Sequence, residues 1–168
     1  MPQQSIPPPS MKPDQKPFVQ IYADGACSGN PGIGGFGAIL VSGEKVKEMS
    51  GCEAMTTNNR MELLGVITAL EALKKPCVVK VVTDSNYVVK GMTEWMGAWL
   101  RNNWKNAQKK AVMNRDLWER LLKAAAPHEV TWSWIKGHNG HAENERCDRL
   151  ATEAIKRCRE RMNSEEKA

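Results

Sequence analysis

Residues 77–83 (CVVKVVT) restrict the possible folds of this chain more than any other segment. The run is almost continuously apolar and rich in β-branched residues, which favour strands. Such a run is typical of a strand that is buried on both faces. The rest of the chain must therefore supply a sheet around this strand and helices that cover the sheet.

Apolar patterning before and after this run predicts those elements. Residues 18–23 alternate apolar and polar and end at Asp24-Gly25, which predicts a strand followed by a turn. The other predicted strands are 35–42 and 45–54, joined as a hairpin, and 129–135. Helical spacing of apolar residues predicts helices at 59–74, 85–101, 114–126 and 142–158. A three-strand meander followed by βα and αβα units indicates an α/β protein (α+β mixed) with helices packed on a mixed sheet.

The two ends of the chain differ in composition from the part between them. Six of the nine prolines lie in residues 1–17, which we expect to be a disordered leader. Residues 159–168 are nearly all charged or polar, and we expect a flexible tail that frays. The folded domain is therefore expected to span residues 18–158.

Charge and cysteine content narrow the partners and the compartment. The chain has 24 Lys and Arg against 19 Asp and Glu, a net charge of +5, which is compatible with a polyanionic partner. No run approaches the ~18 apolar residues of a membrane span, and no apolar segment marks the start as a secretory signal. The five cysteines show no C-x-x-C pair, so we expect reduced thiols, mostly in the core of a cytoplasmic protein. The sequence shows no sustained heptads and no extra apolar face that would pack against another protein chain, so we expect a monomer.

Four carboxylates occupy positions where a sheet and its helices would meet. Asp24 and Asp84 are predicted to close the first and fourth strands, and Glu62 and Asp148 lie near the starts of two helices. In α/β sheets, strand ends and helix starts gather at the crevice that binds ligands. Carboxylates gathered there would repel one another unless a hard divalent cation lay between them. An all-oxygen site favours Mg²⁺ or Mn²⁺ over Zn²⁺.

Each acid also has an ordinary structural interpretation. Asp24 followed by glycine is a common turn dipeptide, and Asp84 followed by serine suits a helix N-cap. Glu62 three residues after Asn59 resembles a capping box, and Asp148 could be a charge beside an apolar stripe. Periodicity alone does not select these four from the 19 acids.

Four local motifs around these acids are more specific than the acids themselves. They are ADGACSGNPG (23–32), TTNNRMEL (56–63), TDSNYV (83–88) and IKGHNGHAENERCDRLA (135–151). Together, from about Phe18 to Ile155, they resemble bacterial type 1 ribonuclease H (ribonuclease HI). The resemblance implies a ribonuclease H-like fold, in which a five-stranded mixed sheet with strands 1–3 antiparallel carries helices on both faces. It also implies an endonuclease that cuts the RNA strand of an RNA/DNA hybrid and leaves 3′-hydroxyl and 5′-phosphate ends.

The resemblance also implies catalytic roles. The family's four metal-binding acids match Asp24, Glu62, Asp84 and Asp148, with Asp24 between two Mg²⁺ ions when substrate is bound and Mn²⁺ as an alternative. A pair of ions can activate a water and neutralise the leaving 3′-oxygen. His138 matches a loop histidine that is thought to move a proton or help product leave, and an imidazole that titrates near neutrality suits either task. The alternative for His138 is an ordinary exposed loop histidine.

A basic segment is implied to bind the DNA strand. Residues 95–115 contain five Lys and Arg and no acid, with three tryptophans interleaved, and match the family's basic protrusion, or handle. The residues implied to contact substrate are Trp95, Trp99, Trp104, Lys105, Lys109 and Lys110. The alternative is a solvated charge run over core tryptophans, and packing suits Trp99 and Trp104 better than Trp95.

Recognition of the RNA strand is implied beside the catalytic acids. An enzyme that cuts only RNA must detect 2′-hydroxyls in the minor groove. The positions that match the family's contacts are Gly25, Ala26, Cys27, Asn58, Asn59 and Asn86. Asn58 or Asn59 could instead cap the following helix.

Three positions depart from the family's pattern. Asn30 and Thr57 match a DNA phosphate pocket, but Met55 stands where an arginine is common, which is expected to weaken phosphate binding. Asn86 stands where close relatives often carry glutamine, and its shorter amide reaches less far. Ala111 replaces a proline after the handle's lysines, which is expected to loosen that corner.

Two other function classes remain open from the sequence. A non-catalytic nucleic-acid-binding module could have this fold, but four intact acids and the histidine argue against it. A DNA-cutting relative, such as a resolvase or transposase, would share the fold and the paired metals. The basic segment and TTNNRMEL favour the hybrid-specific ribonuclease.

Overall fold

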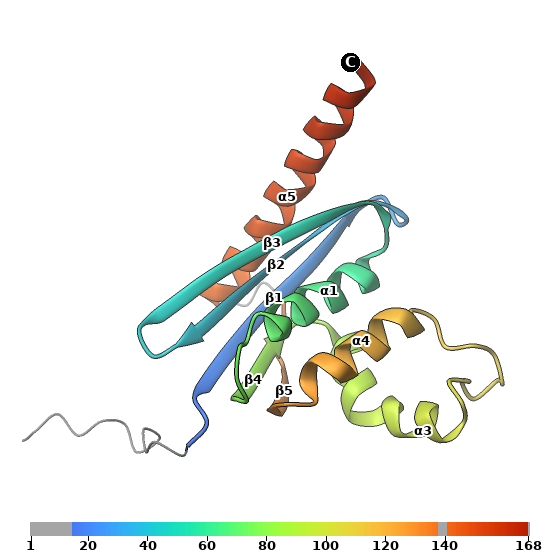
Figure 1. Ribbon diagram of the computed structural model, residues 1–168. Helices are drawn as coiled ribbons and strands as arrows, with labels where there is room; N and C mark the ends of the chain where they lie inside the picture. The colour runs from blue at the N-terminus through green and yellow to red at the C-terminus, as the bar shows by residue number, and fades with distance from the viewer. Residues whose placement is uncertain (1–14, 138–140, 168) are drawn as a thin grey trace, which may run out of the picture.

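The computed structural model describes residues 15–137 and 141–167, and Figure 1 shows its elements. Five strands form one sheet in the order β3-β2-β1-β4-β5. The strands are β1 (Phe18–Ser28), β2 (Gly32–Ser42), β3 (Lys45–Thr56), β4 (Val78–Thr83) and β5 (Glu129–Trp134). Antiparallel pairing joins β1, β2 and β3, whereas β4 pairs parallel with β1 and with β5. The expected five-stranded mixed sheet is confirmed.

Helices cover both faces of the sheet formed by β1, β2 and β3 (Figure 1). The expectation that β4 is buried on both faces is wrong, because Lys80 in the middle of this strand is exposed. On one face α1 (Asn58–Glu71) packs on β1 and β2, and α4 (Arg115–Ala125) packs on α1. On the other face α5 (Ala142–Lys167) crosses β1, β2 and β3. Between β4 and α4 lie α2 (Asn86–Lys90), the π-helical turn η1 (Gly91–Trp95) and α3 (Met96–Arg101). None of the described helices has the length and apolarity needed to cross a bilayer.

Alternate residues of the inner strands belong to two separate cores. Ile21 and Ala23 of β1 are buried with α1, whereas Tyr22 of β1 and Ile39 of β2 pack with the start of α5. Side chains alternate between the faces of a strand. Asp24, which follows Ala23, therefore belongs to the α5 face.

The first strand is longer than the sequence indicates, and the expected turn at Asp24-Gly25 is wrong. Asp24 and Gly25 pair with Gly37 and Phe36 of β2, and β1 continues to Ser28. Gly25 is needed for a different reason: a Cβ there would lie 2.5 Å from the backbone nitrogen of Glu62. The glycine lets α1 approach the strand closely.

Two helices also differ from expectation. The helix expected at 85–101 contains the π-helical turn η1, at the point where the ring of Trp118 lies against Gly91. The tail expected to fray from residue 159 is helical, because α5 continues to Lys167 and its arginines bond to the sheet. Residues 1–14 of the expected leader lie outside the described residues.

The expectation that all cysteines are reduced is wrong for one pair. Cys52 of β3 and Cys158 of α5 form a disulfide, with their Cα atoms 6.2 Å apart and a sequence separation of 106. Cys27, Cys77 and Cys147 are free, and the last two are buried in the core, as expected. A pair so distant in sequence carries no spacing signal, so only the packing of α5 on β3 reveals it.

Gly37→Ala is expected to lower the free energy of unfolding by about 1–3 kcal/mol through overpacking. A Cβ at this position would lie 2.4 Å from the carbonyl oxygen of Cys147 and 2.6 Å from Cβ of Leu150, where α5 crosses β2. Denaturant unfolding measures the loss. Gly65→Ala on α1 is the matched control, because its nearest atom would lie at 3.4 Å and alanine favours a helix. An unchanged stability for Gly37→Ala would contradict this close approach.

Candidate active site

Three carboxylates meet where β1 and β4 stop pairing. The parallel register ends at Ala23 opposite Thr83, so the next residues, Asp24 and Asp84, lie side by side. Glu62 reaches the same point from α1, which approaches β1 over Gly25. One carboxylate oxygen from each of the three acids lies within 4.8 Å of the others. Three of the four sequence-predicted acids are thus brought together.

Asp148 joins the group from α5. It lies on the face of the sheet to which Asp24 belongs, close enough for its charge to raise the pKa of the Asp24 carboxyl. Asp24, Asp84 and Asp148 line one small cavity of about 130 Å³. All four predicted acids therefore surround one point, each from a different secondary-structure element or strand end.

Burial and mutual repulsion raise the pKa of two of these carboxyls. Burial, followed by the charges of Asp84 and Asp148, raises the pKa of Asp24 to about 7. Burial, followed by the charges of Asp24 and Asp84, raises the pKa of Glu62 to about 8. A hydrogen bond from Ser85 lowers the pKa of Glu62 and offsets only part of this rise. Acids held so close favour either a bound proton or a bound cation.

The donor set fits a hard divalent cation. Its ligand atoms would all be carboxylate oxygens, which suit Mg²⁺ and Mn²⁺. Oε2 of Glu62 is buried and has no hydrogen-bond partner within the described part of the chain. Buried carboxylate oxygens nearly always have a hydrogen-bond partner, so an oxygen without one is suited to bind a cation.

Asn144 is a site residue that sequence reasoning missed. It is 6% exposed, lines the same cavity as the acids, and its Oδ1 has no hydrogen-bond partner among the described residues. It lies four residues before Asp148, which places both on one face of α5. The i, i+4 spacing from Asp148 was the feature of the sequence that could have identified Asn144 as a site residue.

Neighbouring residues perform the ordinary structural roles considered for these acids. Ser85 caps α2, because its Oγ accepts a hydrogen bond from the Val88 nitrogen at 3.2 Å. Thr57 caps α1, because its Oγ1 accepts from the Arg60 nitrogen at 3.3 Å. Asp84 is therefore no cap, and neither Asn58 nor Asn59 caps α1.

His138, predicted as a catalytic residue, lies outside the described residues. The chain on both sides of it approaches the acids. A Cβ on Gly137 would lie 2.7 Å from Oδ2 of Asp84, and His141 lines the cavity with the acids.

Most of the residues predicted to contact the RNA strand and the phosphate pocket lie where the β1–β2 turn meets the start of α1, whereas Asn86 lies at the start of α2. The Asn58 nitrogen donates to Oδ1 of Asn30 at 3.2 Å, and Cys27 Sγ donates to the Thr56 carbonyl at 3.3 Å. Met55 is 72% exposed beside them and offers no charge. Four of the predicted side chains are exposed: Asn30, Asn58, Asn59 and Asn86.

Stacked aromatic rings connect the basic segment to the core. The ring of Trp99 lies 5.2 Å from that of the fully buried Trp118 and 6.2 Å from that of Trp104. Trp95 continues the row, 5.8 Å from Trp99. Trp104 is only 8% exposed, so it packs in the core, whereas Trp95 is half-buried.

The lysines of the segment lie in the loop between α3 and α4, which projects from the body of the molecule (Figure 1). Lys105, Lys109 and Lys110 are all exposed. Oδ1 of Asn106 accepts from the Lys110 nitrogen at 3.0 Å, and Lys105 forms an antiparallel bridge with Ala111. Hydrogen bonds to backbone groups therefore join the two sides of this loop, and the expected loosening at Ala111 stays a prediction.

Known proteins match this chain over most of its length. The family model for RNase H matches residues 16–156. Ribonuclease H of Syntrophotalea carbinolica is 61% identical over 142 residues, which is 84% of this chain and 93% of that protein. The crystal structure of LC9-RNase H1, a type 1 RNase H with the type 2 active-site motif, covers 83% of this chain and 72% of its own, with 36% identity and a TM-score of 0.76. LC11-RNase H1 in complex with RNA/DNA hybrid shows the same fold at 23% identity and a TM-score of 0.64, with 83% and 98% covered. The chain belongs to the RNase H family.

Proposed function

We propose that this chain is an endoribonuclease that hydrolyses the RNA strand of RNA/DNA hybrids and leaves 3′-hydroxyl and 5′-phosphate ends. The convergence of Asp24, Glu62 and Asp84 within 4.8 Å, with Asp148 lining the same cavity as Asp24 and Asp84, carries this proposal. Membership of the RNase H family supports the same reaction. The hybrid is the substrate, and a monomer is the active form.

The four carboxylates are proposed to hold two Mg²⁺ ions when the hybrid is bound, with Mn²⁺ as an alternative. When bound, the pair would supply an activated water and stabilise the leaving 3′-oxygen. Asp24 is suited to a central place among the ligands, because it clusters with Glu62 and Asp84 and lines a cavity with Asp148. The unpartnered Oε2 of Glu62 is a free ligand atom for this purpose.

Residues around the acids are proposed to orient the hybrid and to move a proton. His138 would transfer a proton or help product leave, and the closeness of the preceding residue, Gly137, to Asp84 supports this role. The backbone of residues 25–27 and the exposed amides near it would detect the 2′-hydroxyls. Asn30 and Thr57 would bind a DNA phosphate, and the basic loop with Trp95 would grip the DNA strand.

Cleavage of end-labelled, sequence-matched RNA/DNA, RNA/RNA and DNA/DNA duplexes, with Mg²⁺ and with EDTA, tests the function directly. Metal-dependent cutting of the RNA strand in the hybrid alone is the expected result. Cutting of DNA would assign the chain to the resolvase-like class instead. Tight hybrid binding without cutting would assign it to the binding modules.

Asp24→Asn is expected to lower the rate of hybrid cleavage by about a thousandfold or more while hybrid binding persists, because the central ligand loses its charge. Single-turnover kinetics and a binding titration measure the two effects. Asp116→Asn is the matched control, since Asp116 on α4 is exposed and forms an ion pair with Arg60 of α1. Cleavage by Asp24→Asn near the wild-type rate would refute the metal assignment.

The stability of the metal-free protein is expected to fall as the pH rises from about 4 to about 8. In this window the unfolded chain ionises its acids, whereas the folded chain keeps protons because the pKa of Asp24 is raised to about 7 and that of Glu62 to about 8. The folded state then binds more protons, so raising the pH favours unfolding. Denaturant unfolding in EDTA across this range measures the slope. Asp24→Asn should make the dependence of stability on pH weaker, and Asp116→Asn should leave it unchanged. Equal slopes for the two variants would contradict the destabilisation by the clustered acids.

Replacement of Lys105, Lys109 and Lys110 together by Ala is expected to raise KM by about tenfold or more and to leave kcat nearly unchanged, because phosphate contacts are lost. The slope of log KM against log salt should fall by about two to three. Ala at Lys74, Lys75 and Lys80, three exposed lysines before and within β4, removes the same charge elsewhere and is the control. Equal effects of both triple variants would mean that the loop lysines act only through the net charge of the protein and make no specific contact with the hybrid.

A further inference from the structure

The last turns of α5 carry three arginines that bond only to neutral atoms of the sheet. Arg157 donates to Ser50 Oγ at 3.0 Å, and Arg161 donates to Cys52 Sγ at 3.1 Å. Arg159 donates to Ser28 Oγ at 2.8 Å. Their charges are therefore bound to hydroxyl and sulfur atoms rather than to carboxylates.

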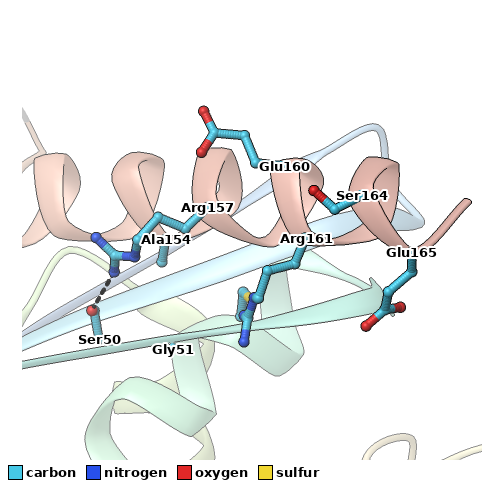
Figure 2. A pocket seen from close by; sticks show the side chains of 9 residues that line it. Ser50, Gly51, Ala154, Arg157, Glu160, Arg161, Ser164 and Glu165 are labelled. Carbon is cyan, nitrogen blue, oxygen red and sulfur yellow. Dashed lines mark hydrogen bonds between the residues drawn. The ribbon is translucent and has the colours of Figure 1, made fainter. Parts of the chain in front are cut away.

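These arginines contrast with others that have acidic partners. Arg146, earlier on α5, forms an ion pair with Glu48 at 2.6 Å. Within the described residues, Arg157, Arg159 and Arg161 form no ion pair within 4 Å. Figure 2 shows Glu160, the acid next to Arg159, pointing away from the sheet. The positive charge at this end of α5 remains available to a polyanion.

The three arginines do not all face the same way. Cys158 faces the sheet, and successive helix residues are rotated by about 100°, so Arg157 and Arg159 leave the helix on opposite flanks. Arg157 and Arg161 extend toward β3, the outer strand (Figure 2). Arg159 extends toward β1, the strand that carries Asp24. Of these three arginines, only Arg159 lies on the side of α5 that faces the active site.

The distance from Arg159 to the acids can be estimated along α5 and along β1, and the two estimates are similar. Asp148 and Arg159 are separated by 11 residues, about three helical turns, so they share a flank of α5 about 16 Å apart along its axis. Asp24 and Ser28 are separated by four residues of β1, about 13 Å along the strand. Each strand of a duplex carries one charge per ~3.4 Å of axis, so this distance spans about four to five nucleotides.

The disulfide fixes the helical turn from which Arg159 extends. Cys158 directly precedes Arg159 and is bonded to Cys52 of β3. The helix therefore cannot lift from the sheet at this point without breaking a covalent bond. A guanidinium held on one turn loses less conformational freedom when it binds a phosphate.

We propose that Arg159 is an additional substrate-binding residue, which contacts a backbone phosphate of the hybrid about four to five nucleotides from the scissile bond. The Cys52–Cys158 disulfide positions it there. This inference rests on the proposed function and extends the substrate-binding surface beyond the β1–β2 turn.

The test compares the full-length protein with Arg159→Ala and with the matched control Arg157→Ala on a hybrid of about 18 base pairs. Arg159→Ala is expected to raise KM by about threefold to tenfold, to leave kcat unchanged and to lower the salt slope by about one. Arg157→Ala should keep the wild-type KM. Ser28→Ala removes the hydrogen bond but not the charge and should also keep it. An unchanged KM for Arg159→Ala, or an equal rise for Arg157→Ala, would overturn the proposal.

Hybrid length gives a second, geometric readout. On hybrids that extend only about three base pairs beyond the cut at one end, the phosphate that Arg159 would contact is missing. The effect of Arg159→Ala should disappear for shortening at one end and persist for shortening at the other. An effect that persists with both shortened hybrids would contradict a contact at this distance.

A double-variant cycle tests the role of the disulfide. Cys52→Ser should raise KM when Arg159 is present and have no further effect in the Arg159→Ala background, while circular dichroism reports that both variants are folded. Additive effects would refute the positioning role. Wild-type protein that cuts no hybrid would refute the proposed function itself, whereas loss of hybrid affinity in Arg159→Ala, measured by a binding titration, still tests the phosphate contact alone.

Discussion

The parallel pairing of β1 with β4 is the interaction on which the rest of this site depends. It ends at Ala23 and Thr83, and so it places Asp24 and Asp84 next to each other. On the other side of β1, the strands β2 and β3 extend the sheet, and α1 and α5 cover its two faces there. One of these helices brings Glu62 and the other brings Asp148. Sheet order and site composition therefore have one physical origin.

Local patterns in the sequence predicted what local forces determine. The β-branched run gave β4, apolar periodicity gave α1 and α4, and the motifs identified all four acids. The extended β1 was missed, because Asp24-Gly25 has turn chemistry and only long-range pairing with β2 keeps it in a strand. The π-helical turn depends on the ring of Trp118, a contact that spans 27 residues from Gly91. Such contacts are invisible to a window of a few residues.

The site was predictable in its charged residues and less so in its supporting polar ones. An acid in a motif stands out, whereas Asn144 looks like any amide in the first turn of a helix until its burial beside the acids is known. Trp104 shows the opposite case: its place among basic residues suggested a nucleic-acid contact as well as packing, and its burial assigns it to packing. In both cases burial, rather than residue type, decides the role.

The last helix connects these observations. It carries Asp148 at one end of its contact with the sheet and Arg159 at the other, and a covalent bond joins the second end to β3. Clustered acids destabilise the metal-free fold, as the raised pKa values of Asp24 and Glu62 indicate. A disulfide that closes a loop of about a hundred residues contributes about 2–4 kcal/mol in the opposite direction. The helix that brings Asp148 to the destabilising cluster is thus also the helix that a covalent bond joins to the sheet. This bond opposes the separation of α5 from the sheet that repulsion between the acids favours.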